Sequence, residues 1–115
     1  MPYQISVNLT DANGNPLALD TPLVKAALSF ENLTISTTVV PLPTIPASAV
    51  AAVITLEGAF EDSIRYTIDG TTPSSSVGHQ KYSEDDITLV DRAQLTSFQA
   101  LRIGTADITA RITYY

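Results

Sequence analysis

Ile64-Arg65-Tyr66-Thr67-Ile68-Asp69-Gly70-Thr71-Thr72-Pro73 is the stretch that decides the fold. Apolar and polar residues alternate up to Ile68, as in a β-strand with one buried face, which places Ile64, Tyr66 and Ile68 inward and Arg65 and Thr67 outward. Asp-Gly followed by proline is turn chemistry, because glycine accepts a positive φ and proline cannot donate to a strand ladder. The stretch therefore predicts a β-strand that enters a chain reversal.

Strand patterns continue on both sides of this stretch, whereas helix patterns are almost absent. Residues 49–57 can bury both faces and predict a central strand, with Val50, Ala52, Ile54 and Leu56 on one face, and residues 58–62 then reverse the chain. Residues 72–80 are poor in large apolar side chains and predict a surface loop. Further strands are expected at 87–90, 97–103 and 108–115, with one short helical turn capped by Asp91.

The first part of the chain has strand patterns of its own. Residues 4–10 alternate, residues 11–16 are dense in turn formers, and residues 17–19 resume a strand. Residues 23–40 predict two strands that break at Asn32, although residues 23–28 also fit one or two helical turns. Pro41, Pro43 and Pro46 remove three backbone donors, so the proline-rich segment 41–46 is expected to be a crossover or an edge strand.

Short strands with turns about every ten residues are typical of a two-sheet sandwich. The sequence therefore predicts an all-β fold, an immunoglobulin-like antiparallel β-sandwich of about seven to nine strands with at most one helical turn near 91–96. Residues 1–115 are expected to form a single domain. Residues 1–48 would supply N-terminal strands and the proline-rich crossover, and residues 49–115 would carry the deciding stretch.

Composition excludes several classes of function. The formal net charge of −6 and the lack of a basic run argue against nucleic-acid binding through phosphate neutralisation. The chain has no cysteine, which excludes disulfides, thiolate metal sites and a catalytic cysteine. Neither a signal peptide nor an apolar segment long enough to span a bilayer is recognisable, so we expect no membrane partner.

No catalytic, cofactor or metal site is expected, and we predict that the protein is not an enzyme. His79 is the single histidine and has no Gly-x-Ser-x-Gly elbow near it, and no glycine-rich phosphate loop follows a strand. Two groups of oxygen-bearing side chains offer alternatives for calcium, the turn 11–15 and the acidic run 84–86 together with Asp69. The spacing of ligands in the turn 11–15 does not match a calcium loop. An acidic run before a strand, such as 84–86, is usually solvated and holds no ion.

Residues 66–73, Tyr-Thr-Ile-Asp-Gly-Thr-Thr-Pro, are similar to the Tyr-Thr-x-Asp-Gly-Ser/Thr-x-Pro signature of small immunoglobulin-like modules attached to chitobiases and other glycan-active enzymes. A longer resemblance links the chain to small tailed-phage and prophage virion structural proteins of the head-decoration kind. It covers residues 49–115, through the segments 51–58, 64–73 and 77–79, a capped turn like 91–95, and the Phe-x-Ala-hydrophobic-Arg pattern at 98–102.

The phage resemblance implies a virion location after assembly in the host cytoplasm, with the major capsid protein or other virion proteins as partners. We therefore expect a capsid decoration or cement protein that forms a dimer or trimer and stabilises the head across capsomers. The alternatives are a glycan-binding module, for which Tyr82 is the best exposed aromatic candidate, and a tail or collar subunit. Exposed irregular backbone gives the expected partner contacts, which are Pro41, Pro43, Pro46, Thr72, Pro73, His79 and Tyr82.

The alternation of Ile108, Ala110, Ile112 and Tyr114 reaches the C-terminus, so the chain is expected to end inside a sheet. Deleting the last four residues, 112–115, should lower the melting temperature strongly or prevent folding, because two inward side chains and their ladder hydrogen bonds are lost. A thermal melt of the truncated protein checks this. An unchanged melting temperature would show that the last strand is not part of the fold.

Overall fold

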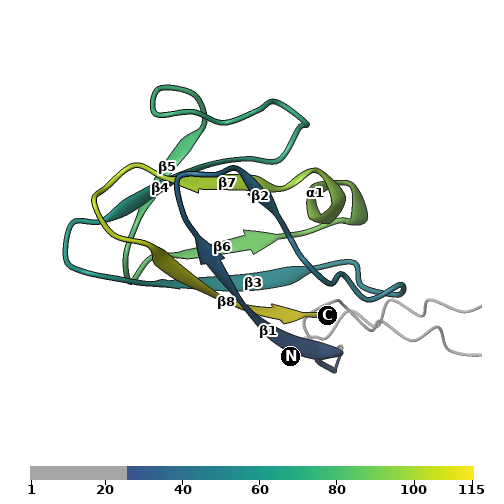
Figure 1. The fold of residues 1–115 in the computed structure, drawn as a ribbon. Coiled ribbons are helices and arrows are strands. Elements are labelled where there is room, and N and C mark those ends of the chain that lie inside the picture. Colours follow the sequence, from purple (N-terminus) through teal and green to yellow (C-terminus); the bar gives the residue numbers. More distant parts are fainter. Residues whose placement is uncertain (1–25) are drawn as a thin grey trace, which may run out of the picture.

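Two four-stranded antiparallel sheets pack against each other in the structure, a computed structural model that describes residues 26–115 (Figure 1). In spatial order, the first sheet contains β1 (Ser29–Ile35), β8 (Ile108–Tyr114), β3 (Ala52–Glu57) and β6 (Asp86–Leu89). The second contains β2 (Val40–Pro41), β7 (Gln99–Arg102), β4 (Ser63–Thr67) and β5 (His79–Tyr82). The predicted antiparallel β-sandwich is confirmed. The strands expected at 4–10 and 17–19, the turn 11–16 and the start of segment 23–40 lie outside the described residues.

The core lies between the sheets and follows the strand alternation. In β3, Ala52, Ile54 and Leu56 are buried, whereas Thr55 and Glu57 are exposed. In β8 every second residue is buried, from Ile108 to Tyr114. Each large apolar side chain that is removed from water contributes about 1.5–3 kcal/mol, so the alternating residues of these two central strands supply much of the stability. The prediction of a central strand at 49–57 is confirmed, although Val50 precedes β3 and is exposed.

The single helix of the described residues, α1 (Arg92–Ser97), is the expected short helical turn. The carboxylate of Asp91 accepts the backbone N–H of Gln94 at 2.8 Å, as an N-cap does. Leu95 and the following Phe98 are buried, so the turn closes one end of the core. Among the described helical residues there is no segment long and apolar enough to cross a membrane.

Nearly every connection carries the chain from one sheet to the other. Only β4 and β5 are consecutive strands that pair with each other in the described region. The pairs β3–β6 and β4–β7 correspond to the central pairs of an immunoglobulin sandwich. The last strand differs, because β8 lies between β1 and β3 instead of extending the sheet of β7. As a result, residues 29–35 of the proposed first segment pair along their whole length with β8 of the second.

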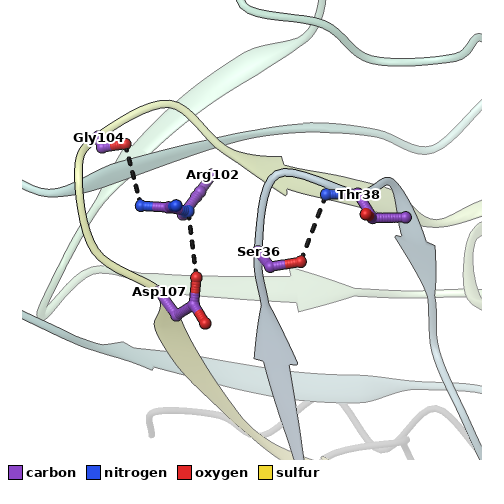
Figure 2. Close-up of polar contacts among 5 residues, drawn as sticks. All are labelled: Ser36, Thr38, Arg102, Gly104 and Asp107. Atoms are coloured by element: carbon purple, nitrogen blue, oxygen red, sulfur yellow. Dashed lines mark hydrogen bonds and ion pairs between the residues drawn. The ribbon is translucent and has the colours of Figure 1, made fainter.

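The prediction of a strand break at Asn32 is wrong. β1 runs through this residue, and Asn32 Oδ1 accepts a hydrogen bond from Arg111 Nη1 on β8 at 3.0 Å, so it behaves as an outward strand residue. The chain leaves β1 after Ile35, where Ser36 Oγ accepts the backbone N–H of Thr38 (Figure 2). Asparagine tolerates turns, but cross-strand pairing decided its conformation here.

Two further local predictions need correction. Thr67 is buried, because its hydroxyl donates to the carbonyl of Thr71 and the following chain folds over it. The expected surface loop 72–80 ends early, since His79 already begins β5. β5 has a polar sequence and is mostly exposed, so it has no apolar alternation, and only its pairing with β4 makes it a strand.

Arg102, the last residue of the Phe-x-Ala-hydrophobic-Arg pattern, orders the connection between β7 and β8. Its guanidinium lies between the carbonyl of Gly104, 3.3 Å from Nη1, and the carboxylate of Asp107, 3.1 Å from Nε (Figure 2). Its backbone N–H donates to Ser36 O at 2.8 Å, which joins this connection to the β1–β2 turn. One arginine therefore fixes two crossovers at the same end of the sandwich.

Tyr114 joins the core to the proline-rich segment. Its ring is buried in the core, and its hydroxyl donates to Glu31 Oε2 on the neighbouring strand β1. The same carboxylate oxygen accepts the backbone N–H of Thr44 at 3.0 Å. Burial and the Glu31 carboxylate raise the pKa of Tyr114, because both disfavour a phenolate.

This pKa shift predicts a loss of stability in alkaline solution. An unfolded tyrosine ionises near pH 10, and the folded protein holds the proton of Tyr114 above that pH, so the stabilisation is complete below pH 10 and declines as pH rises further. Tyr114→Phe should lower stability at pH 7 by about 1–3 kcal/mol. The gap in melting temperature between wild type and variant should then shrink from pH 8 to pH 11.

The matched control for this experiment is Tyr82→Phe, since the Tyr82 side chain is half exposed. Melting temperatures measured by circular dichroism across the pH series give the comparison. A gap for Tyr114→Phe that stays constant up to pH 11 would contradict the expected linkage.

Candidate functional site

The candidate site is the loop of residues 68–78 between β4 and β5, which we call the signature loop because it carries most of the Tyr-Thr-x-Asp-Gly-Thr-x-Pro pattern. Its conformation depends on two glycines. Gly70 has φ +90° and open space around its α-carbon, whereas Gly78 has φ +117° and lies against the backbone of Tyr66. A β-carbon at Gly78 would be 2.9 Å from Tyr66 O. Gly78 is therefore required for both its backbone angle and its lack of a side chain.

The other signature residues fold the loop from within. The hydroxyl of Thr67 donates to Thr71 O, and Asp69 Oδ1 accepts the backbone N–H of Thr71 at 3.0 Å. The second bond lowers the pKa of Asp69, because it stabilises the carboxylate. Pro73 is buried under the loop. Instead of the tight two-residue hairpin that Asp-Gly favours, the chain makes a wider excursion that reverses between Ser74 and Val77.

The base of the loop rests on aromatic rings and one arginine. The Tyr66 ring stacks on buried Phe98 at 5.8 Å and meets the His79 ring at 5.4 Å, measured between ring centroids. Arg65 Nη1 donates to Gly78 O at 2.9 Å. These contacts hold the loop against β4 and β7, so the signature residues primarily determine the shape of the loop.

An open hollow of about 400 Å³ lies beside the loop. Its lining residues come from the end of β4, the loop and the start of β5, and they are Thr67, Ile68, Asp69, Thr71, Val77, Gly78 and His79. Ile68 and Val77 provide apolar wall, and Asp69 provides the carboxylate. The Asp69 carboxylate accepts the Thr71 amide through Oδ1, and this bond orients the carboxylate group.

The expected contact residues divide between two edges of the second sheet. Pro41 and Pro43 are exposed and Pro46 is half-buried at the β2 edge, whereas Thr72, His79 and Tyr82 are exposed at or near the β5 edge. Two strands separate these edges. Pro73 does not offer its ring to a partner, because the loop buries it. The expected contacts therefore form two surfaces instead of one.

Sequence reasoning missed Phe60, whose exposed fraction of 88% is the highest among the large apolar residues of the described region. It lies in the turn between β3 and β4, beside the turn between β5 and β6, because Ser83 Oγ donates to Ala59 O and Ser83 N donates to Asp62 O, both at 2.9 Å. Tyr82, which is 47% exposed, precedes the second turn. A phenylalanine placed between small and acidic residues in a reversal was the available sequence signal.

The acidic run 84–86 and Asp69 lie at opposite ends of the β4–β5 hairpin, so the structure does not bring them together as a joint calcium site. Residues 26–115 contain no group of three His, Asp or Glu side chains arranged to hold a metal ion. Glu84 adopts φ +74° in the tight β5–β6 turn, where Asp85 Oδ2 accepts the Tyr82 N–H at 2.9 Å. The turn thus uses the acidic run for its own geometry.

The two glycines of the signature loop give a comparative prediction. Gly78→Ala should destabilise the protein by about 1–3 kcal/mol, because it adds backbone strain at a positive φ and a close contact with Tyr66 O. Gly70→Ala meets no neighbouring atom and should cost less, about 1 kcal/mol. Chemical denaturation of both variants measures the difference. Equal losses would show that the close approach to Tyr66 is unimportant.

No protein-family model, no curated protein sequence and no solved structure matches this chain.

Proposed function

We propose that this chain is a structural protein of a tailed-phage virion that binds the head surface as a decoration protein. The resemblance to phage proteins rests on residues 51–58, 64–73 and 77–79. In space these segments are β3, β4, the signature loop and the start of β5. They include the loop whose shape depends on the matching residues, which supports the resemblance with a physical reason for the pattern.

The observation that carries the proposal is that exposed irregular backbone is held in fixed positions. The proline-rich segment 41–46 is tied at Thr44 by Glu31 and at Pro46 by Arg92, whose Nη1 donates to Pro46 O at 2.6 Å and to Ala49 O at 3.0 Å. The signature loop is tied at Gly78 by Arg65. Segments that are ordered before binding lose little conformational entropy when a partner covers them.

Binding through these fixed segments would stabilise a phage head, because it would add interface area between neighbouring capsomers. A specific interface of standard size buries roughly 800 Å² on each partner. Two separate surfaces, at the β2 and β5 edges, would let one copy contact two neighbours at once. Self-association into a dimer or trimer through one surface would leave the other for the capsid. This part of the proposal is non-enzymatic and needs no cofactor.

A glycan-binding module is the second candidate function, and exposed aromatic side chains favour it. Phe60 lies in the β3–β4 turn and Tyr82 ends β5, directly before the adjoining β5–β6 turn at the same end of the sandwich. Aromatic faces near carboxylates are a common way to hold sugar rings, and Glu61 and Glu84 lie in the same two turns. This surface is distinct from the signature loop, so the two functions predict different sensitive residues.

Co-sedimentation with phage heads that lack this protein tests the proposal. Wild type should pellet with the heads, and Pro43→Arg or Thr72→Arg should weaken binding about tenfold or more, because a bulky charge is placed at the centre of a contact. Thr88→Arg on the exposed face of β6 is the matched control and should bind as wild type does. Electron microscopy of the decorated particle distinguishes head from tail or collar.

Failure of wild type to bind undecorated heads, together with binding to an oligosaccharide array that Phe60→Ser or Tyr82→Ser abolishes, would replace the first proposal with the second. Light scattering after size exclusion tests self-association. A pure monomer at high concentration would count against an oligomeric decoration protein.

A further inference from the structure

The hollow beside the signature loop has a size that limits what it can bind. Its volume of about 400 Å³ is near the lower end of the range of roughly 300–1,000 Å³ for ligand pockets. It is formed by side chains of one loop and two paired strand ends, and Gly78 O at its edge is held by Arg65. It therefore has room for one long side chain of a partner or for one ring.

The chemistry of the lining favours a long cationic side chain. Ile68 and Val77 present apolar surface, and the Asp69 carboxylate lies among the same lining residues. Arginine and lysine match this arrangement, because an apolar stem can pack against the wall while the charged head reaches the carboxylate. The bond from the Thr71 amide occupies Asp69 Oδ1 at 3.0 Å and orients the carboxylate group.

Other ligand classes fit this lining less well. An anion would meet the Asp69 carboxylate, His79 is the single basic side chain among the lining residues, and the nearby Arg65 guanidinium is already bound to Gly78 O. A sugar ring would find one aromatic ring among the lining residues, that of His79, which already meets the Tyr66 ring. Between the two cationic side chains, arginine fits better, because its planar guanidinium can bind a carboxylate and a carbonyl with several donors at once.

We propose that the hollow formed by Ile68, Asp69, Val77 and His79 receives an arginine side chain of the partner protein. The proposal rests on the proposed function for the existence of a protein partner, and it names the chemistry of the contact. The net charge of −6 supports it, because an acidic protein is attracted to a basic patch on its partner before the side chain enters.

Nuclear magnetic resonance of the full chain provides the test, with N-acetyl-L-arginine N-methylamide as the probe. The backbone amides of Gly70, Thr71 and Gly78 should shift in a saturable way, with a dissociation constant of about 1–10 mM. Asp69→Asn should weaken the probe about threefold to fivefold. This variant keeps the oxygen that accepts the Thr71 amide, so the loop retains its shape while the charge is lost.

Two controls separate the contributions of charge and stem. Asp86→Asn removes an equal charge from the exposed face of β6 and should leave probe binding unchanged. The N-methylamide of N-acetyl-norleucine has an apolar stem without a charge and should shift the same amides weakly. No saturable shift at the three amides, equal binding by Asp69→Asn, or tighter binding of N-acetylglucosamine at the same amides would overturn the proposal.

A result against the arginine pocket can be distinguished from a result against the decoration role. Phage-head binding by wild type combined with no response to the arginine probe would overturn only the arginine pocket. A saturable, Asp69-dependent response to the probe in a protein that binds no heads would overturn only the decoration role.

Discussion

The packing of the two sheets against each other is the interaction on which the rest of the structure depends. Each sheet buries only one face, so neither is stable without the other, and almost every connection between described strands crosses from one sheet to the other. The two central strands β3 and β8 bury every second side chain in this interface. A chain wound in this way has little freedom to lose one strand without loosening both layers.

This interface also determines where the exposed segments lie. Tyr114 extends from the core to Glu31, which in turn holds the proline-rich segment at Thr44. On the opposite edge, Phe98 supports Tyr66, and Tyr66 supports the base of the signature loop. Both candidate contact surfaces are therefore connected to the core through one or two side chains. This connection explains how a small sandwich can present loops in fixed positions without disulfides.

The signature pattern has a structural explanation that is independent of any ligand. Thr67, Asp69 and Gly70 shape the first half of the loop, and buried Pro73 supports the second half. A pattern of this kind can recur wherever a β4–β5 excursion of this shape is useful, whether for a virion protein or for a module attached to an enzyme. Function must then be read from the side chains that the loop and the start of β5 expose, among them Asp69, Val77 and His79.

The sequence by itself determined the features that depend on local periodicity and capping. The strands around Ile54, Ile64 and Ile112, the cap at Asp91 and the exclusion of Pro41 from a central strand were all predicted, because each follows from alternation or from a single residue's backbone chemistry. Tertiary structure alone decided the features that depend on partners distant in the chain. Pairing with β8 kept Asn32 inside a strand, pairing with β4 made polar β5 a strand, and the fold of the loop buried Thr67 and Pro73. The hollow beside Asp69 belongs to the same group, since its wall joins residues that are adjacent only after the sheet forms. Periodicity reports which face of a segment is apolar, but it carries no information about which segment will lie beside it.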